Sequence, residues 1–189
     1  EAVALGIGGN DFYKKAFMNL DESALGSDTM KKIFDQMRKL RGYVDKNFSG
    51  RDWNLATAMV MKGEAAFQIM GDWAKGEFTA AGKVPGVDYY CAATPSNNGY
   101  LYNVDSFIFY KTSDPDKQAG QKLLAKLMMG KNFQKVFNLY KGSIPARLDV
   151  PMDEFDKCAK TSNADIKTAG AKGGLVPSFA HGMAQGNTM

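Results

Sequence analysis

Apolar residues recur at helical spacing along much of the chain. After Gly8-Gly9, residues 12–20 keep this spacing and predict one short helix. A longer helix is predicted from about residue 28 to residue 44, because Ser27 or Asp28 can cap it and one of its faces is continuously apolar. The members of that apolar stripe are Met30, Ile33, Phe34, Met37, Leu40 and Val44. We expect the stripe to face a core.

Five more helices are predicted downstream, each bounded by a capping residue, a glycine or a proline. They cover residues 52–61, 73–81, 115–129, 132–140 and 152–169. The turn-rich segment Thr94-Pro-Ser-Asn-Asn-Gly separates the second from the third and predicts a hinge or a domain crossing.

Short apolar runs between these helices predict buried strands. The runs are residues 64–70, 88–93 and 106–110, and the apolar segment before Gly8 is interpreted as a strand too. Strands that alternate with helices are typical of an α/β protein, in which the helices pack on a largely parallel sheet. Phe67, Ile69 and Tyr90 are then expected in the core together with the Met30 to Val44 stripe.

Composition narrows the class of protein. The chain has 189 residues, of which 44% are hydrophobic and 23% charged, close to the averages of globular proteins. The net charge of +4 comes from lysines spread among acidic residues, so no nucleic-acid partner is predicted. The longest apolar runs, such as residues 65–70, are far shorter than the roughly 20 residues that cross a bilayer.

Metal and phosphate chemistry find little support. Cys91 and Cys158 form no CxxC motif, and His181 is the single histidine, so a zinc site has too few soft ligands. The eleven methionines fall largely within helical patterns and are interpreted as core filling. Neither Gly6-Ile-Gly-Gly-Asn nor Gly170-Ala-Lys-Gly-Gly has phosphate-loop spacing. No metal and no cofactor are predicted. The two cysteines would be buried thiols in a reducing compartment and could be paired in an oxidising one.

Four blocks of sequence carry a family resemblance. Met61-Lys-Gly-Glu-Ala-Ala-Phe-Gln-Ile-Met-Gly-Asp-Trp-Ala resembles a motif of the extracellular solute-binding proteins that serve ABC sugar importers. The other three blocks resemble the branch that binds glucose and mannose: Tyr102-Asn-Val-Asp-Ser-Phe, Lys141-Gly-Ser-Ile-Pro-Ala-Arg-Leu-Asp-Val and Pro177-Ser-Phe-Ala-His-Gly-Met-Ala. The resemblance covers the chain but only the C-terminal half of such a protein. No signal-peptide pattern opens the chain, which indicates a mature or a truncated start. Because the opening apolar segment that ends in Gly-Gly-Asn is interpreted as a strand already inside a fold, we expect an internal fragment of a longer protein.

The resemblance implies a fold, with lobes joined by hinge strands. The chain is expected to form a periplasmic-binding-protein-like (type II) α/β lobe, plus a helical segment that normally belongs to the other lobe. Residues 1–93 would be the core of the C-terminal lobe and residues 94–144 the hinge crossing with its helical pair. Residues 145–189 would return to the C-terminal lobe, and the start of the N-terminal lobe would be absent.

The resemblance also implies a function. The protein would be periplasmic and would bind a monosaccharide of the glucose or mannose class in an interlobe cleft, for delivery to the membrane subunits of an ABC permease. It would not be an enzyme. In the oxidising periplasm, Cys91 and Cys158 would form a disulfide. Surface left uncovered by the missing lobe would favour self-association of the fragment.

The implied ligands of the sugar are Trp73, Asn103, Asp105, Lys141 and His181. A hexose needs planar polar groups at its edge and an aromatic ring on its face, and a carboxylate, an amide and an ammonium group supply the polar part. Residues 103 and 105 would point to the same side of an extended segment. Taken singly, these residues also fit a turn, a helix cap, core packing or an exposed surface.

Two other function classes remain open. A glycoside hydrolase would need two opposed carboxylic acids, for which Glu64, Asp72 and Asp105 are available, but no paired-acid motif is present. A structural or interaction module with a vestigial cleft is the third hypothesis.

Overall fold

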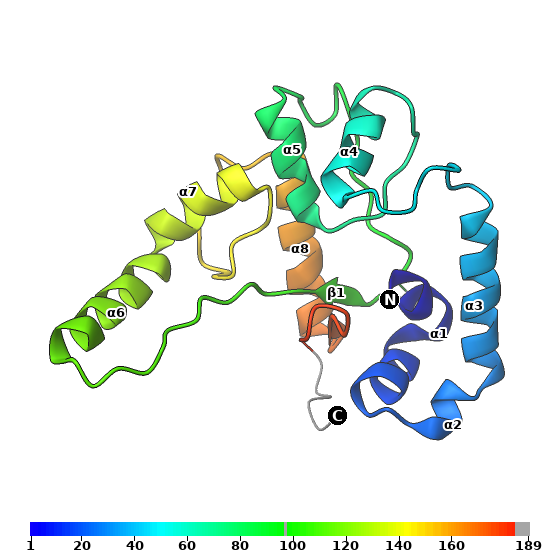
Figure 1. The fold of residues 1–189 in the computed structure, drawn as a ribbon, viewed down its shortest axis with the longest axis horizontal. Helices are drawn as coiled ribbons and strands as arrows, with labels where there is room; N and C mark the ends of the chain where they lie inside the picture. The colour runs from blue at the N-terminus through cyan, green and yellow to red at the C-terminus, as the bar shows by residue number, and fades with distance from the viewer. Residues whose placement is uncertain (97, 184–189) are drawn as a thin grey trace. The chain divides into compact units, whose positions relative to one another are not determined.

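The computed structural model describes residues 1–96 and 98–183, so Asn97 of the predicted turn and residues 184–189 lie outside the description. The chain divides into two compact units (Figure 1). Unit 1 contains Glu1–Arg51, Ala92–Val104 and the chain from Ala164 onward, and unit 2 contains Asp52–Cys91 and Asp105–Asn163.

Unit 1 begins with a group of helices. They are α1 (Ala2–Tyr13), a π-helical turn (Lys14–Met18), α2 (Glu22–Leu25) and α3 (Asp28–Arg41). The Ser27 hydroxyl caps α3 by accepting the Met30 N–H, and α3 packs along α1 (Figure 1). The buried core of the unit consists of Ala4, Leu5, Tyr13, Ala16, Ala24, Met30, Ile33 and Val176.

The sheet of unit 1 has two short parallel strands. β1 (Tyr100–Tyr102) pairs with β2 (Leu175–Pro177) in a register that sets Leu101 opposite Val176. The backbone N–H of Ser178 extends the pairing by donating to the Tyr102 carbonyl at 2.8 Å. Both strands therefore end at the same edge of the sheet.

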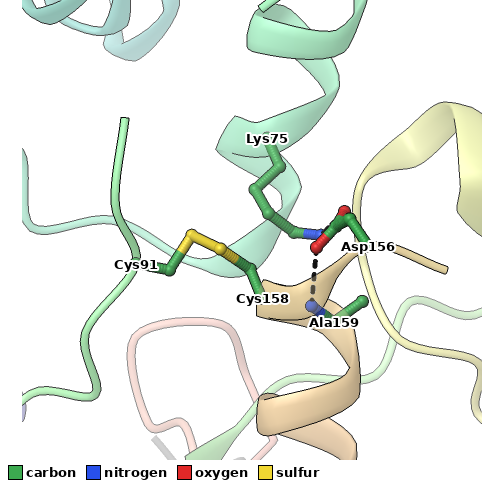
Figure 2. The surroundings of a disulfide bond; sticks show 5 residues. All are labelled: Lys75, Cys91, Asp156, Cys158 and Ala159. Atoms are coloured by element: carbon green, nitrogen blue, oxygen red, sulfur yellow. Dashed lines mark hydrogen bonds and ion pairs between the residues drawn. A yellow bond between two sulfur atoms is a disulfide. The ribbon is translucent and has the colours of Figure 1, made fainter. Parts of the chain in front are cut away.

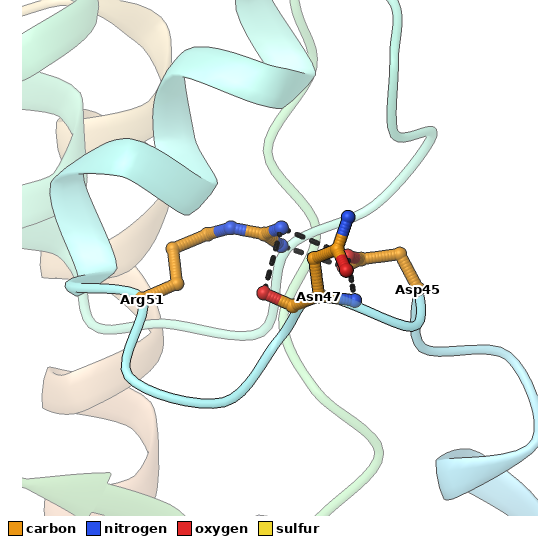
Figure 3. A network of polar contacts seen from close by, with 3 residues as sticks. All are labelled: Asp45, Asn47 and Arg51. Atoms are coloured by element: carbon orange, nitrogen blue, oxygen red, sulfur yellow. Dashed lines mark hydrogen bonds and ion pairs between the residues drawn. The ribbon is translucent and has the colours of Figure 1, made fainter.

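The loop after α3 is folded by its own side chains. The Arg51 guanidinium donates to both carboxylate oxygens of Asp45, at 2.6 and 2.8 Å, and to the Asn47 carbonyl at 3.1 Å (Figure 3). The Arg41 guanidinium lies over the Phe48 ring, 4.1 Å from its centroid. This bidentate pairing holds the loop in one shape.

Unit 2 is helical. It contains α4 (Trp53–Met61), the 3₁₀ turn η2 (Asp72–Ala74), α5 (Lys75–Ala80), α6 (Pro115–Met128), α7 (Lys131–Lys141) and the first part of α8 (Lys157–Ala171). Helix α5 contacts both α4 and α7. A side chain at Gly76 would meet the carbonyl oxygen of Lys141 at 2.7 Å, so glycine lets α5 approach the end of α7.

A disulfide and a buried ion pair join three segments of unit 2 (Figure 2). Cys91 is bonded to Cys158, with 5.8 Å between their Cα atoms, and the predicted disulfide is present. Asp156 accepts the Ala159 N–H at 2.8 Å at the start of α8 and pairs with the Lys75 ammonium at 2.6 Å. The Lys75 side chain is buried, so this pair is shielded from water on one side.

The helices were predicted better than the strands. Helices are present in all the predicted regions, and Met30 and Ile33 are buried as expected. The prediction that the whole stripe faces a core was wrong, because Phe34, Met37 and Val44 are exposed. Helix α3 packs mainly on α1 and less on α2, and these neighbours leave Phe34 and Met37 uncovered.

The predicted strands at residues 64–70, 88–93 and 106–110 were wrong. Phe67 is 91% exposed, Ile69 61% and Tyr90 83%, so these residues are not in a core. An extended segment becomes a strand only beside another, and no strand of the described residues pairs with these three. The opening segment is helical (α1) rather than a strand, with a break at Gly9, where φ is 73°, and Ala4, Leu5 and Tyr13 along it are buried. The fold is thus helix-rich with a small parallel sheet.

Candidate functional site

The five predicted sugar ligands divide between the two units. Trp73, Asp105 and Lys141 belong to unit 2, whereas Asn103 and His181 belong to unit 1. The ligands of each unit are therefore described separately. The predicted common orientation of Asn103 and Asp105 stays a prediction.

Lys141 and Asp105 form an ion pair within unit 2. Lys141 is the last residue of α7, which ends because Gly142 adopts a left-handed conformation with φ of 88°. Its ammonium also lies 5.9 Å from the centroid of the Phe137 ring. Asp105 remains mostly exposed, so the pair presents an acceptor and a donor side by side at the surface of unit 2. Such a pair can address neighbouring hydroxyl groups of one ligand.

Trp73 is held half-buried in the η2 turn. Its indole ring folds back over Gly71, where any side chain would collide with the ring. A large apolar ring in this position offers a face for stacking, but it is also ordinary packing for a helix start. Glycine at position 71 therefore leaves room for the Trp73 ring.

Asp72 connects the Trp73 turn to the loop that follows Lys141. Its carboxylate accepts the backbone N–H of Ile144 at 3.1 Å. Burial raises the pKa of Asp72, and the Ile144 N–H and nearby Lys75 and Lys141 oppose that shift. The Ser143 hydroxyl lowers the same pKa, although it makes no hydrogen bond of good geometry among the described residues. The hydrogen bond from Ile144 to Asp72 therefore links the segment that carries Trp73 to the segment that follows Lys141.

Asn103 and His181 come from the carboxyl edge of the two-stranded sheet. Asn103 directly follows β1, and His181 lies four residues beyond the end of β2. Parallel strands that end together bring the following residues to one edge. An amide and an imidazole are therefore supplied from the same end of unit 1.

His181 is anchored by a hydrogen-bonded chain that sequence reasoning missed. Its Nδ1 lies 2.7 Å from the Ser178 hydroxyl oxygen, which lies 2.8 Å from the Glu1 carboxylate. The same carboxylate accepts the Tyr13 hydroxyl at 2.6 Å and the Ala180 N–H at 3.0 Å. The Pro177-Ser-Phe-Ala-His block contained Ser178, but nothing in the sequence pointed to Glu1.

The arrangement of acids gives the hydrolase hypothesis no support. The Asp105 carboxylate is paired with an ammonium group, and the Asp72 carboxylate accepts a backbone N–H. Both of these contacts are with hydrogen-bond donors, whereas hydrolysis would need an acid that faces a base across the scissile bond. Within residues 1–96 and 98–183, no three potential metal ligands of the His, Cys, Asp or Glu type gather, and no helix is long and apolar enough to span a membrane.

Comparison with known proteins gives the class. The sequence pattern described as bacterial extracellular solute-binding protein matches residues 3–168. The chain belongs to this family of binding proteins, which confirms that class over an enzyme and agrees with the predicted location outside the cytoplasm.

Several curated relatives are similar over nearly the whole chain. A probable sugar-binding periplasmic protein of Mesorhizobium japonicum is 54% identical over 183 residues, which is 96% of this chain and 44% of the relative. A Brucella suis protein of the same description is 55% identical over 185 residues, 97% of this chain and 44% of the relative. An uncharacterized ABC transporter extracellular-binding protein of Pyrococcus horikoshii is 37% identical over 185 residues, covering 97% and 40%. The chain thus spans less than half the length of these relatives.

Proposed function

We propose that this chain is part of the periplasmic sugar receptor of an ABC importer and that it binds a monosaccharide of the glucose or mannose class. The names of the similar Mesorhizobium and Brucella proteins support a sugar, and that of the Pyrococcus protein supports an ABC transporter. The observation that carries the proposal is the ion pair between the exposed Asp105 and the half-buried Lys141, which suits a ligand rich in hydroxyl groups.

The chemistry of each side chain matches a part of a hexose. The Asp105 carboxylate accepts from one or two hydroxyls, and the Lys141 ammonium donates charge-assisted bonds. The Trp73 ring offers an apolar face to the C–H side of the sugar. Asn103 and His181 add polar groups from the sheet edge of unit 1.

The architecture of the full-length protein is the second part of the proposal. The chain would contribute the type II C-terminal lobe and the hinge, and the remaining length seen in the relatives would contribute most of the other lobe. The sugar would lie in the cleft between the lobes, and closure of the hinge would present the loaded form to the permease.

Calorimetric titration of the full-length protein tests the proposal. Glucose, mannose and a disaccharide are injected separately, and one monosaccharide is expected to bind with saturable heat. After incubation, the recovered sugar and a chromogenic glycoside are analysed by NMR. Unchanged sugar together with binding supports a receptor. Glycoside hydrolysis would support the rival class, and no heat from either monosaccharide would contradict the assigned ligand.

A further inference from the structure

Asn98-Gly99 is the only asparagine–glycine pair in the 189-residue sequence. The pair lies immediately before β1, and Asn98 is exposed. An asparagine followed by glycine is chemically labile, because the next backbone nitrogen can attack the side-chain amide and glycine has no side chain to obstruct the attack. The pair is therefore a candidate site of covalent modification in unit 1.

The reaction of such a pair needs no reagent but water. The Gly99 nitrogen forms a bond to Cγ of Asn98, and the bond from Cγ to the side-chain nitrogen breaks. That nitrogen leaves as ammonia and takes the hydrogen that the Gly99 nitrogen loses. Water then opens the cyclic imide at either of its carbonyl groups, which leaves aspartate or isoaspartate at position 98.

The fold holds the nitrogen that would attack. The Gly99 N–H donates to the Ser96 carbonyl at 2.8 Å, so the hydrogen that must be lost is engaged in a hydrogen bond. A side chain at position 99 would meet Leu5 Cδ1 at 2.9 Å and would collide with the side-chain oxygen of Asn10, so Gly99 packs closely against α1. Attack therefore requires the nitrogen to give up its hydrogen bond to Ser96.

The carbonyl end of the same peptide group is held as well. Asn98 has a left-handed φ of 66°, which asparagine tolerates better than most residues. A side-chain carbon at Gly174 would lie 2.5 Å from the Asn98 carbonyl oxygen, so glycine allows this close approach. The Tyr100 N–H then donates to the Gly174 carbonyl at 2.9 Å, where the pairing of β1 with β2 begins. Both ends of the peptide group between Asn98 and Gly99 are thus fixed in folded unit 1.

We propose that Asn98 is a site of spontaneous deamidation, which the folded turn suppresses and which local opening of unit 1 permits. The extent of modification then reports how often the segment before β1 opens. Isoaspartate carries the main chain through the side-chain carbons and lengthens it by one carbon, so the product should fit poorly beside Gly174. All the contacts that suppress the reaction lie within unit 1, and none involves a predicted sugar ligand.

Peptide mapping of the full-length protein tests the proposal. The protein is incubated in native buffer and in urea, then reduced, digested and analysed by mass spectrometry, with fragment ions to locate the gain of one mass unit. Position 98 is expected to react in urea and at least about tenfold more slowly in native buffer, which corresponds to an opening free energy of about 1.4 kcal/mol. Asn103, which valine follows, is the internal control and should stay unchanged in both solutions.

Two glycine variants separate protection by the turn from the intrinsic reactivity of the pair. Gly174→Ala places a carbon against the Asn98 carbonyl, so it should speed the reaction in native buffer and leave the rate in urea unchanged. Gly170→Ala is the matched control and should change neither rate, because its new carbon would meet Leu175 at an ordinary 3.5 Å. If Gly174→Ala does not fold, the comparison of native buffer with urea in the parent sequence remains decisive.

The effect of the modification is measured on the product. Chains with isoaspartate are enriched by chromatography and refolded, and their urea midpoint should lie below that of Asn98→Asp, which adds the same charge without lengthening the main chain. Equal midpoints would refute the predicted loss of fit. Equal rates in native buffer and in urea would overturn the protection, and an unreacted position 98 in urea would overturn the site itself.

Discussion

The carboxylate of Asp72 accepts a hydrogen bond from the backbone N–H of Ile144 at 3.1 Å, although 72 positions separate the two residues. The contact ties the turn that carries Trp73 to the loop that follows Lys141. It acts beside the close approach of Gly76 to the end of α7. The geometry of the proposed site in unit 2 therefore depends on one buried acceptor and on a glycine contact.

Removing that acceptor should destabilise the fold. Asp72→Ala leaves the Ile144 N–H without its partner, which is expected to lower the free energy of unfolding by about 1–3 kcal/mol. Urea unfolding followed by circular dichroism measures the change. Asp35→Ala is the matched control, because its exposed ion pairs with Lys31 and Arg38 are worth little. Equal stabilities of the two variants would contradict the role given to Asp72.

The raised pKa of Asp72 predicts a pH dependence with a definite sign. Since the folded state binds this proton more tightly than the unfolded state, stability should fall as the pH rises from the ordinary value of 3.8 through the raised folded value. The side chain introduced by Asp72→Asn cannot ionise, so the stability of this variant should not fall in that pH range. The urea midpoint of the variant minus that of the unmodified protein should therefore increase as the pH rises through it.

Asp149→Asn is the control of opposite sign. The Arg147 side chain, followed by Lys131, lowers the pKa of Asp149. Its contribution is therefore present above the ordinary carboxyl value and is lost as the pH falls, so the Asn variant should be relatively weaker at neutral pH. A parallel pH response of the Asp72 and Asp149 variants would be inconsistent with their opposite environments.

The accuracy of the sequence predictions follows from the range of the interactions involved. Helices depend on local signals, and the caps at Ser27 and Asp114 and the left-handed Gly142 mark their ends in the structure. Strands depend on neighbours that may be far away in sequence. Phe67 reads as buried although it is exposed, and three-residue strands such as β1 are too short to show an alternating pattern.

The site shows the same division. Asp105 and Lys141 were proposed together from the resemblance, and the structure pairs them. The groups that position the proposed ligands were missed because they act over long separations or through the backbone. Glu1 and Ser178 lie 177 positions apart, and the Ile144 N–H belongs to no side chain. Contacts of this kind are identified from the folded structure and not from local sequence patterns.

The disulfide should contribute strongly to stability. Cys91 and Cys158 are 67 positions apart, and the entropy of closing a loop of this size corresponds to roughly 4 kcal/mol of stabilisation. Unfolding in urea with and without reductant should show a loss of this order. Thiol titration of the unreduced, denatured protein should find none of these two thiols reactive, and two reactive thiols would refute the pairing.

Exposed apolar residues should make the 189-residue chain self-associate. Phe67, Ile69 and Ile108 are all mostly exposed, and apolar surface of this kind commonly finds a partner. Light scattering across a concentration series is expected to give a mass that rises above that of a monomer. The double variant Phe67→Asp, Ile69→Asp should reduce the rise. A purely monomeric chain at high concentration would exclude this expectation.

The most direct measurement is the affinity of Asp105→Ala for the sugar that binds the full-length protein. Loss of the charged acceptor is expected to cost about 2 to 3 kcal/mol, or roughly thirty- to more than a hundredfold in dissociation constant, because sugar hydroxyls lose their partner. Asp35→Ala, on α3, should bind as the unmodified protein does, and circular dichroism confirms that both variants fold. If Asp105→Ala binds the sugar as tightly as the unmodified protein, the Asp105–Lys141 pair is not the sugar site.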